Sequence, residues 1–159
     1  MLTIIGGEWR GRKLKVPRSD SVRPSSSKVR GSIFNIIESL RLKQGFERSF
    51  TDTKCLDIFA GSGALGFEAL SRGADRAVFV EKSRENVKII EANARELGCL
   101  ERISILCMPA NAALGKLAEL GEFHLALADP PYNYSELNQI IEAVAMPNVL
   151  SSQGIFVLE

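Results

Sequence analysis

A glycine-rich loop near residue 60 is the feature that most constrains how this chain can fold. The stretch DIFAGSGALGFEAL, residues 57–70, places Gly61, Gly63 and Gly66 at the spacing G-x-G-x-x-G, between an apolar run and a short apolar helix. Glycines at this spacing let the backbone approach a ligand closely where a strand turns into a helix. In α/β sheets such a loop lies beyond the carboxyl end of a strand, where adenosine cofactors bind. The loop therefore predicts an α/β fold with a cofactor site at this turn.

From this point the chain alternates between strand-like apolar runs and helical ones. The expected strands are Lys54–Phe59, Ala77–Glu81, Ile103–Cys107, Leu125–Asp129 and Gly154–Glu159. Helices are expected from Ala64, Ser83, Asn111 and Ser135, each followed by a glycine or a proline. The alternation indicates a parallel sheet covered by helices on both faces. The expected class is a doubly wound α/β fold.

The segment before the loop divides into an extension and one helix. Residues 1–24 read as short strands broken by glycines, so we expect a β extension on a main domain of residues 25–159. The apolar residues that follow recur at helical spacing and predict an amphipathic helix. These residues are Val29, Ile33, Ile36, Ile37 and Leu40.

Positive charge is concentrated at the N-terminal end. Residues 1–30 carry eight Lys and Arg against two acids, a net charge of +6, whereas the whole chain has a net charge of +1. A basic segment on an acidic body predicts a polyanionic partner at that end. A merely solvated basic hairpin is the alternative that charge alone leaves open.

Several kinds of site are excluded by composition. Cys55, Cys99 and Cys107 show neither C-x-x-C spacing nor a nearby histidine cluster, so we expect small core side chains. His124 is the only histidine, so neither a metal site nor a catalytic triad is expected. With no membrane-length apolar run and no signal-peptide pattern, the chain is predicted to be cytoplasmic.

Asp57 bears on which adenosine cofactor the loop holds. It stands four residues before Gly61, where a carboxylate would repel the pyrophosphate of a dinucleotide. S-adenosylmethionine carries an ammonium and a sulfonium, which the same carboxylate would attract. Glu81 fits either cofactor, because an acid at the end of the second strand can bind ribose hydroxyls. The loop alone leaves a nicotinamide dehydrogenase and a methyltransferase both open.

The stretch LALADPPYNY, residues 125–134, favours the methyltransferase. Asp129-Pro130-Pro131-Tyr132 ends the fourth expected strand, at the same rim of the sheet as the glycine loop. Prolines are stiff and have no N–H, so a carboxylate beside their carbonyls makes an acceptor-only site suited to an NH₂ group. The Tyr132 ring offers a face on which a base could stack. These residues resemble the [DN]-P-P-[YFW] motif of S-adenosylmethionine-dependent amino-methyltransferases.

Three further stretches of the sequence resemble one particular family among these amino-methyltransferases. IIGGEWRGRKLKVP, VRPSSSKVRGSIFNII and CLDIFAGSGALGFEALSRGA, in this order, resemble the RsmD family of bacterial 16S ribosomal RNA guanine-N2 methyltransferases. The resemblance implies a Rossmann-like class I methyltransferase fold, S-adenosylmethionine as cofactor, and the small ribosomal subunit as partner. It also implies a sheet of seven strands, so this chain is expected to end at the fifth, with Ile155–Leu158 as an apolar edge.

The motifs and the resemblance together assign candidate residues. Asp129, Pro130, Pro131 and Tyr132 are expected to hold the target amine and its base as the catalytic set. The resemblance adds Asn111 and Ala112 at the adenine edge of a cofactor site that comprises Asp57, Ala60, Gly61, Gly63, Glu81, Lys82, Asn111 and Ala112. RNA contacts are expected from Trp9, Arg10, Arg12, Lys13 and Arg23, although Trp9 could equally pack on its own domain. A DNA adenine-N6 methyltransferase and a noncatalytic RNA-binding assembly protein on the same scaffold stay open as alternatives.

Overall fold

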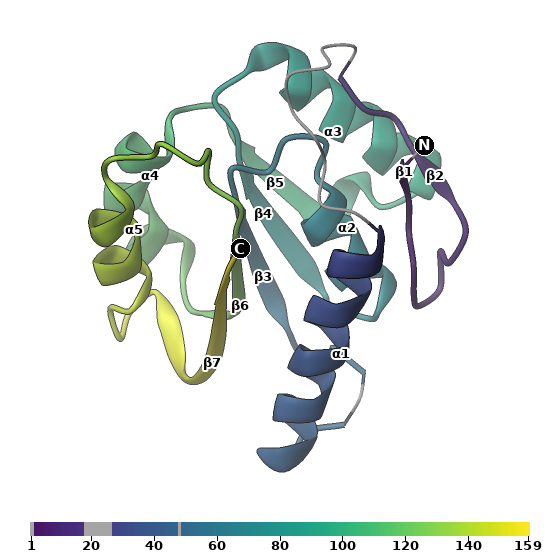
Figure 1. The fold of residues 1–159 in the computed structure, drawn as a ribbon, viewed down its shortest axis with the longest axis horizontal. Helices are drawn as coiled ribbons and strands as arrows, with labels where there is room; N and C mark the ends of the chain where they lie inside the picture. The colour runs from purple at the N-terminus through teal and green to yellow at the C-terminus, as the bar shows by residue number, and fades with distance from the viewer. Residues whose placement is uncertain (1, 18–26, 48) are drawn as a thin grey trace.

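Five parallel strands form the centre of the computed structural model, which describes residues 2–17, 27–47 and 49–159 (Figure 1). Their order across the sheet is β5-β4-β3-β6-β7, and every neighbouring pair is parallel. The strands are β3 (Lys54–Ile58), β4 (Arg76–Val80), β5 (Ile103–Leu106), β6 (Phe123–Ala128) and β7 (Leu150–Leu158). The predicted doubly wound α/β fold is confirmed.

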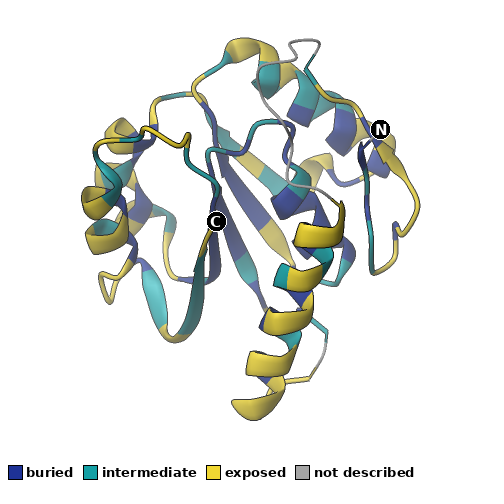
Figure 2. Cartoon of the chain, viewed as in Figure 1, coloured by how far each residue is buried: buried dark blue, intermediate teal, exposed yellow. Residues whose placement is uncertain are grey.

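Helices cover both faces of this sheet. They are α1 (Ser27–Lys43), α2 (Ala64–Ser71), α3 (Arg84–Leu97), α4 (Ala110–Leu117) and α5 (Leu137–Val144), with the short 3₁₀ turns η1 (Leu100–Arg102) and η2 (Ala118–Leu120). Figure 1 shows α4 and α5 on one side of the sheet and α1, α2 and α3 on the other. Figure 2 shows the central strands β3, β4 and β6 buried between these layers and the outer helix surfaces exposed.

Strand residues alternate between two hydrophobic cores. Leu125 and Leu127 of β6 belong to the core shared with α1, α2 and α3. Ala126 and Ala128 belong to the core shared with α4 and α5. This period of two follows from the pleat, which turns successive side chains to opposite faces. Both faces are apolar, as expected for a sheet buried on both sides.

The N-terminal extension is a small antiparallel hairpin that packs into the first of these cores. Its strands are β1 (Leu2–Thr3) and β2 (Lys13–Leu14), with Leu2 opposite Leu14. Leu2, Ile4, Trp9 and Leu14 are buried in the same cluster as the α1–α3 side chains. The described part of the extension therefore contributes core residues. Its predicted boundary at residue 24 lies outside the described residues.

The predicted apolar face of α1 is correct in part. Ile37 is buried and Ile33 packs against the core, whereas Val29, Ile36 and Leu40 are exposed. The buried residues of α1 also include Arg30, Phe34 and Arg41. The two arginines can be buried because their guanidinium groups donate to the backbone carbonyls of Thr3 (2.8 Å) and Ser49 (3.3 Å). A prediction from the spacing of apolar residues alone would expect such arginines to be exposed to solvent.

Two smaller expectations also change. Cys55 and Cys99 are buried as predicted, but Cys107 is exposed because β5 ends one residue before it. β7 begins at Leu150 rather than Gly154, and it lies at one edge of the sheet, so the predicted edge position of Ile155–Leu158 is confirmed.

Candidate active site

Three carboxylates meet at the carboxyl edge of the sheet, where the strand order reverses. β3 pairs with β4 on one side and with β6 on the other, so its end is the topological switch point at which α/β sheets bind ligands. Asp57 lies in β3, Glu81 directly follows β4, and Asp129 directly follows β6. The structure therefore brings together the three acids that the sequence singles out.

The glycine loop joins β3 to α2 and leaves open space at its tip. Gly61 and Gly63 have φ values of 55° and 81°, in the left-handed region that favours glycine. A Cβ at Gly61 would meet no atom within 4 Å. A Cβ at Gly66 would lie 2.3 Å from the Phe79 ring, so the missing side chain lets α2 pack closely on β4. The loop thus combines an accessible backbone with a tightly packed helix start.

Asp57 is buried beneath this loop, with 1% of its surface exposed. Its Oδ2 accepts a hydrogen bond from the Gly66 N–H at 2.9 Å. Burial raises the pKa of Asp57 to about 8, the Gly66 bond opposes the rise, and the carboxylates of Asp129 and Glu81 add to it. An added positive charge would stabilise the ionised form of Asp57. The donor set therefore fits a cationic ligand.

Glu81 ties the glycine loop to the end of β4. Its Oε2 accepts the N–H of Gly61 at 2.8 Å, and its Oε1 accepts the N–H of Ser83 at 2.7 Å. Each carboxylate oxygen can accept more than one hydrogen bond, so both retain capacity for ligand hydroxyls. Glu81 could thus bind a ligand while holding the loop that surrounds it.

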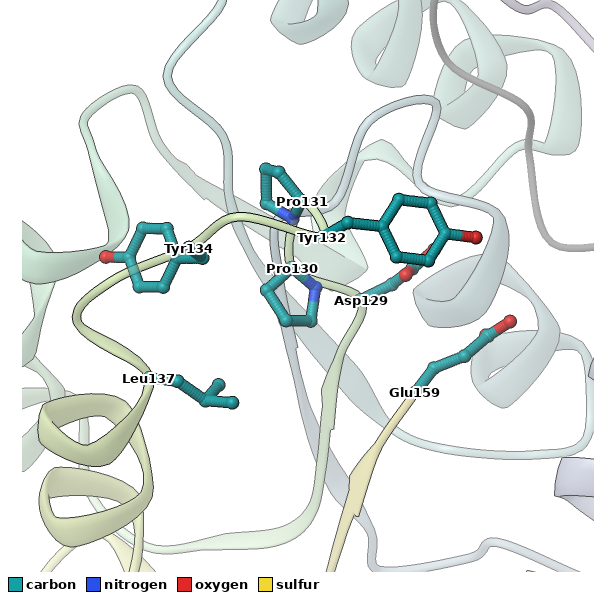
Figure 3. Close-up of a pocket in the computed structure, with 7 residues that line it drawn as sticks. All are labelled: Asp129, Pro130, Pro131, Tyr132, Tyr134, Leu137 and Glu159. Carbon is teal, nitrogen blue, oxygen red and sulfur yellow. The ribbon is translucent and has the colours of Figure 1, made fainter.

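A pocket of about 230 Å³ opens beside Asp129. It is lined by Asp129, Pro130, Pro131, Tyr132, Tyr134, Leu137 and Glu159 (Figure 3). The Tyr132 side chain is fully exposed. Figure 3 shows the Tyr132 and Tyr134 rings pointing to opposite sides of the loop. The pocket has a carboxylate at one wall, apolar rings at another and an exposed aromatic face at its mouth.

Phe59 and Tyr134 connect the two loops, and the sequence argument missed both. Their rings meet edge to face at 4.9 Å and 74°. Phe59 adopts a positive φ of 64°, which ends β3 one residue before the predicted boundary. Tyr134 also donates its N–H to the Pro131 carbonyl at 2.9 Å. The only sequence signal was the presence of aromatic residues next to both motifs.

The other candidate residues differ in exposure. Ala60 is buried within the glycine loop. Lys82 is exposed just after Glu81. Asn111 and Ala112 are exposed in the first turn of α4. The Asn111 backbone forms a hydrogen bond with the Tyr134 phenol, which places this turn beside the pocket.

Trp9 does not occupy the position expected for an RNA contact. Only 7% of its surface is exposed, and the Arg102 guanidinium lies 5.5 Å from its ring centroid. Its backbone N–H donates to Ser71 Oγ at 2.9 Å. Of the two predicted arrangements for Trp9, RNA contact or packing on its own domain, the structure has the second, because the hairpin docks the indole into the core.

The basic candidates near Trp9 remain at the surface. Arg10, Arg12 and Lys13 are exposed. The Arg12 guanidinium donates to the Glu96 carbonyl at 2.7 Å, and this contact holds the extension against α3. Arg23 lies outside the described residues. Within the described ranges, no three or more His, Cys, Asp or Glu side chains form a group that could hold a metal, and no helix is long and apolar enough to cross a membrane.

Comparison with known proteins identifies the family. Residues 2–159 match the family model described as Conserved hypothetical protein 95. Ribosomal RNA small subunit methyltransferase D of Escherichia coli (strain K12) is 35% identical over 159 residues, which cover 99% of this chain and 74% of that protein. This chain belongs to the RsmD family. The resemblance predicted from the sequence is confirmed.

Solved structures share the fold of this chain. A hypothetical protein of Thermus thermophilus superposes with a TM-score of 0.81 at 31% identity, covering 99% of this chain and 85% of that chain. Precorrin-6y C5,15-methyltransferase of Geobacter metallireducens shares the fold, with a TM-score of 0.66 at 22% identity over 91% of this chain and 67% of that chain. Family and fold imply S-adenosylmethionine as the cofactor. The three carboxylates around the glycine loop fit its positive charge.

Proposed function

We propose that this chain transfers the methyl group of S-adenosylmethionine to the exocyclic N2 amine of a guanine in 16S ribosomal RNA. One observation carries the proposal: the Asp129–Tyr132 loop and its pocket stand at the same sheet edge as Asp57, Glu81 and the glycine loop. A cofactor site and an acceptor-only amine site therefore adjoin. The relatives named as small-subunit ribosomal RNA methyltransferases support the choice of RNA.

The cofactor would be held by residues of three strand ends. Asp57 balances the positive charge of the methionine portion, and the backbone at Gly61, where the loop is open, lies against it. Glu81 accepts hydrogen bonds from the ribose hydroxyls. Asn111 and Ala112, in the exposed first turn of α4, border the adenine. When bound, the cofactor supplies a methyl group on a positively charged sulfur.

The Asp129–Tyr132 loop would hold the substrate amine. The lone pair of a guanine N2 is delocalised into the ring, so the amine is a weak nucleophile. The Asp129 carboxylate and the Pro130 carbonyl each accept a hydrogen bond from one of its two N–H groups and favour a pyramidal nitrogen with an available lone pair. Tyr132 is fully exposed at the mouth of the pocket, and its ring stacks on the guanine base once the base has left the RNA helix. The protein therefore promotes methyl transfer by positioning the amine and by placing a negative charge beside it.

The proposal is tested by methyl transfer to small subunits that lack the modification. Labelled methyl groups are expected in 16S ribosomal RNA and not in duplex DNA, with mass spectrometry identifying N2-methylguanine. Methylation of adenine in DNA would support the DNA methyltransferase alternative. Binding to subunits without methyl transfer would support a noncatalytic assembly protein.

The exposed basic residues of the extension are expected to bind RNA phosphates. Arg10→Ala/Lys13→Ala should weaken RNA binding and reduce the slope of log affinity against log salt by roughly 1–2, because two phosphate contacts are lost. Deleting residues 1–22 would be a poor test, since four core residues lie in this segment. The matched control is Lys43→Ala/Lys116→Ala, which removes two exposed lysines from α1 and α4. Equal losses in the two double variants would contradict a role for the extension.

Glu81→Ala is expected to weaken S-adenosylmethionine binding by about 1–3 kcal/mol, the scale for losing hydrogen bonds to a charged group. Glu81→Gln keeps one acceptor oxygen and should lose less. Calorimetry of both variants measures the effect, and NADH serves as a negative control that should bind neither. Unchanged affinity in Glu81→Ala would exclude Glu81 as the ribose ligand.

A further inference from the structure

The side chain of Asn93, on α3, contacts the N-terminal extension and the glycine loop at once. Its Oδ1 accepts the Lys15 N–H at 2.8 Å. Its Nδ2 donates to the Lys15 carbonyl and to the Ser62 carbonyl, both at 3.1 Å. Only 1% of Asn93 is exposed. A buried amide with three hydrogen bonds has one orientation, because rotating it would leave polar groups unpaired.

The two segments that Asn93 joins are far apart in sequence. One is the extension that is proposed to bind RNA, and the other is the glycine loop that is proposed to bind the cofactor. Lys15 directly follows β2 and extends the hairpin edge. Ser62 is buried in the glycine loop, directly after Gly61, where a Cβ would meet no atom within 4 Å. One side chain therefore fixes the position of the glycine loop relative to the extension.

Further contacts hold the extension on the helices that flank this loop. Glu68 of α2 is buried and accepts the N–H groups of Ile5 and Gly6, each at 2.8 Å. The Lys15 ammonium lies 2.8 Å from the Glu96 carboxylate, one turn after Asn93 on α3. The extension is docked by several contacts, and the Asn93 side chain continues this docking to the glycine loop through its hydrogen bond to the Ser62 carbonyl.

We propose that Asn93 is a positioning residue through which the N-terminal extension holds the glycine loop in its cofactor-binding form. Loosening the Lys15 contact frees the Asn93 amide and with it the Ser62 carbonyl. The loop then samples conformations that bind the cofactor less well. RNA held by Arg10 and Lys13 stabilises the docked extension and raises cofactor affinity, and by linkage the cofactor raises RNA affinity by the same factor. This last step rests on the proposed function.

The test compares two substitutions at one position, without RNA. Lys15→Pro removes the N–H that Asn93 accepts, together with the ion pair to Glu96. Lys15→Ala removes the ion pair and keeps the N–H. The dissociation constant of S-adenosylmethionine, measured by calorimetry, is expected to be about three- to ten-fold higher in Lys15→Pro than in Lys15→Ala, the range for one lost hydrogen bond. Asn93→Ser, which leaves Lys15 unchanged, should weaken binding by a similar factor.

A stability control separates positioning from general loosening. Ser71→Ala removes the hydroxyl that donates to the Gly6 carbonyl and accepts the Trp9 N–H, so it destabilises the same extension away from Asn93. It should lower the melting temperature as Lys15→Pro does and leave cofactor affinity within two-fold of wild type. Equal cofactor affinity in Lys15→Pro and Lys15→Ala, or an equal loss in Ser71→Ala, would overturn the proposal. If Lys15→Pro weakens S-adenosylmethionine binding as expected but the wild-type protein methylates no RNA, the proposed function is rejected and the positioning role of Asn93 still holds.

Discussion

Asp129→Ala is expected to lower the turnover of methyl transfer by roughly 100-fold or more while leaving S-adenosylmethionine affinity within a few-fold. Asp129 follows β6 and lines the pocket, whereas the glycine loop and Glu81 form the opposite side of the site. Its carboxylate accepts a hydrogen from the amine most strongly as the nitrogen becomes pyramidal. The interaction therefore stabilises the transition state more than the bound cofactor. Single-turnover rates on unmodified small subunits, with calorimetry for the cofactor, measure the two effects separately.

Asp129→Asn is the matched variant, because it keeps the size and one acceptor oxygen. It should retain partial activity, between wild type and Asp129→Ala. Melting temperatures of all three proteins check that the loop is intact. A fully active Asp129→Ala protein would remove the catalytic assignment and favour the noncatalytic RNA-binding alternative.

Features that depend on local sequence were predicted well. The strands around the glycine loop are short and apolar, and the loop that follows β3 was recognisable because its glycines adopt conformations that other residues avoid. Glu81 and Asp129 could be placed because residues that follow parallel strands meet at one edge of the sheet. Neither placement required knowledge of a distant contact.

Features that depend on distant contacts were missed. Asn93 lies 78 residues from Lys15 and 31 from Ser62, and its role depends on both neighbours. The sequence left two positions open for Trp9, and only the fold shows that the hairpin buries it against the domain. The face of α1 was misassigned in part, because Arg30 is buried and donates to the Thr3 carbonyl. In each case a polar or amphipathic side chain is stabilised by a partner that periodicity does not reveal.

The raised pKa of Asp57 predicts that the cofactor-free protein loses stability as pH rises from about 4 to about 8. The pKa of Asp57 is about 8 in the native state, mainly through burial, and an unfolded aspartate has a pKa near 3.9. Between these values the native state holds a proton that the unfolded state has released. This contribution to the free energy of unfolding is therefore complete below about pH 4 and lost through pH 8, at up to ~1.4 kcal/mol per pH unit. Asp57→Asn removes it, so the difference in unfolding free energy between variant and wild type, measured in urea, should change with pH in this window.

Cofactor binding is expected to show the opposite pH dependence through the same group. A cationic ligand prefers ionised Asp57, so binding below pH 8 must expel the Asp57 proton. The affinity of the wild-type protein for S-adenosylmethionine should therefore increase with pH up to about 8, by at most roughly ten-fold per pH unit. The reason is that the free-energy cost of ionising Asp57 falls as the pH rises. The Asp57→Asn variant has no proton to release at this position, so calorimetry at pH 6.5 in two buffers of different ionisation enthalpy should show greater proton release by wild type. Equal proton release by the two proteins would mean that Asp57 does not change its protonation when the cofactor binds. That result would contradict the assignment of Asp57 as a group that ionises to balance the cofactor's positive charge.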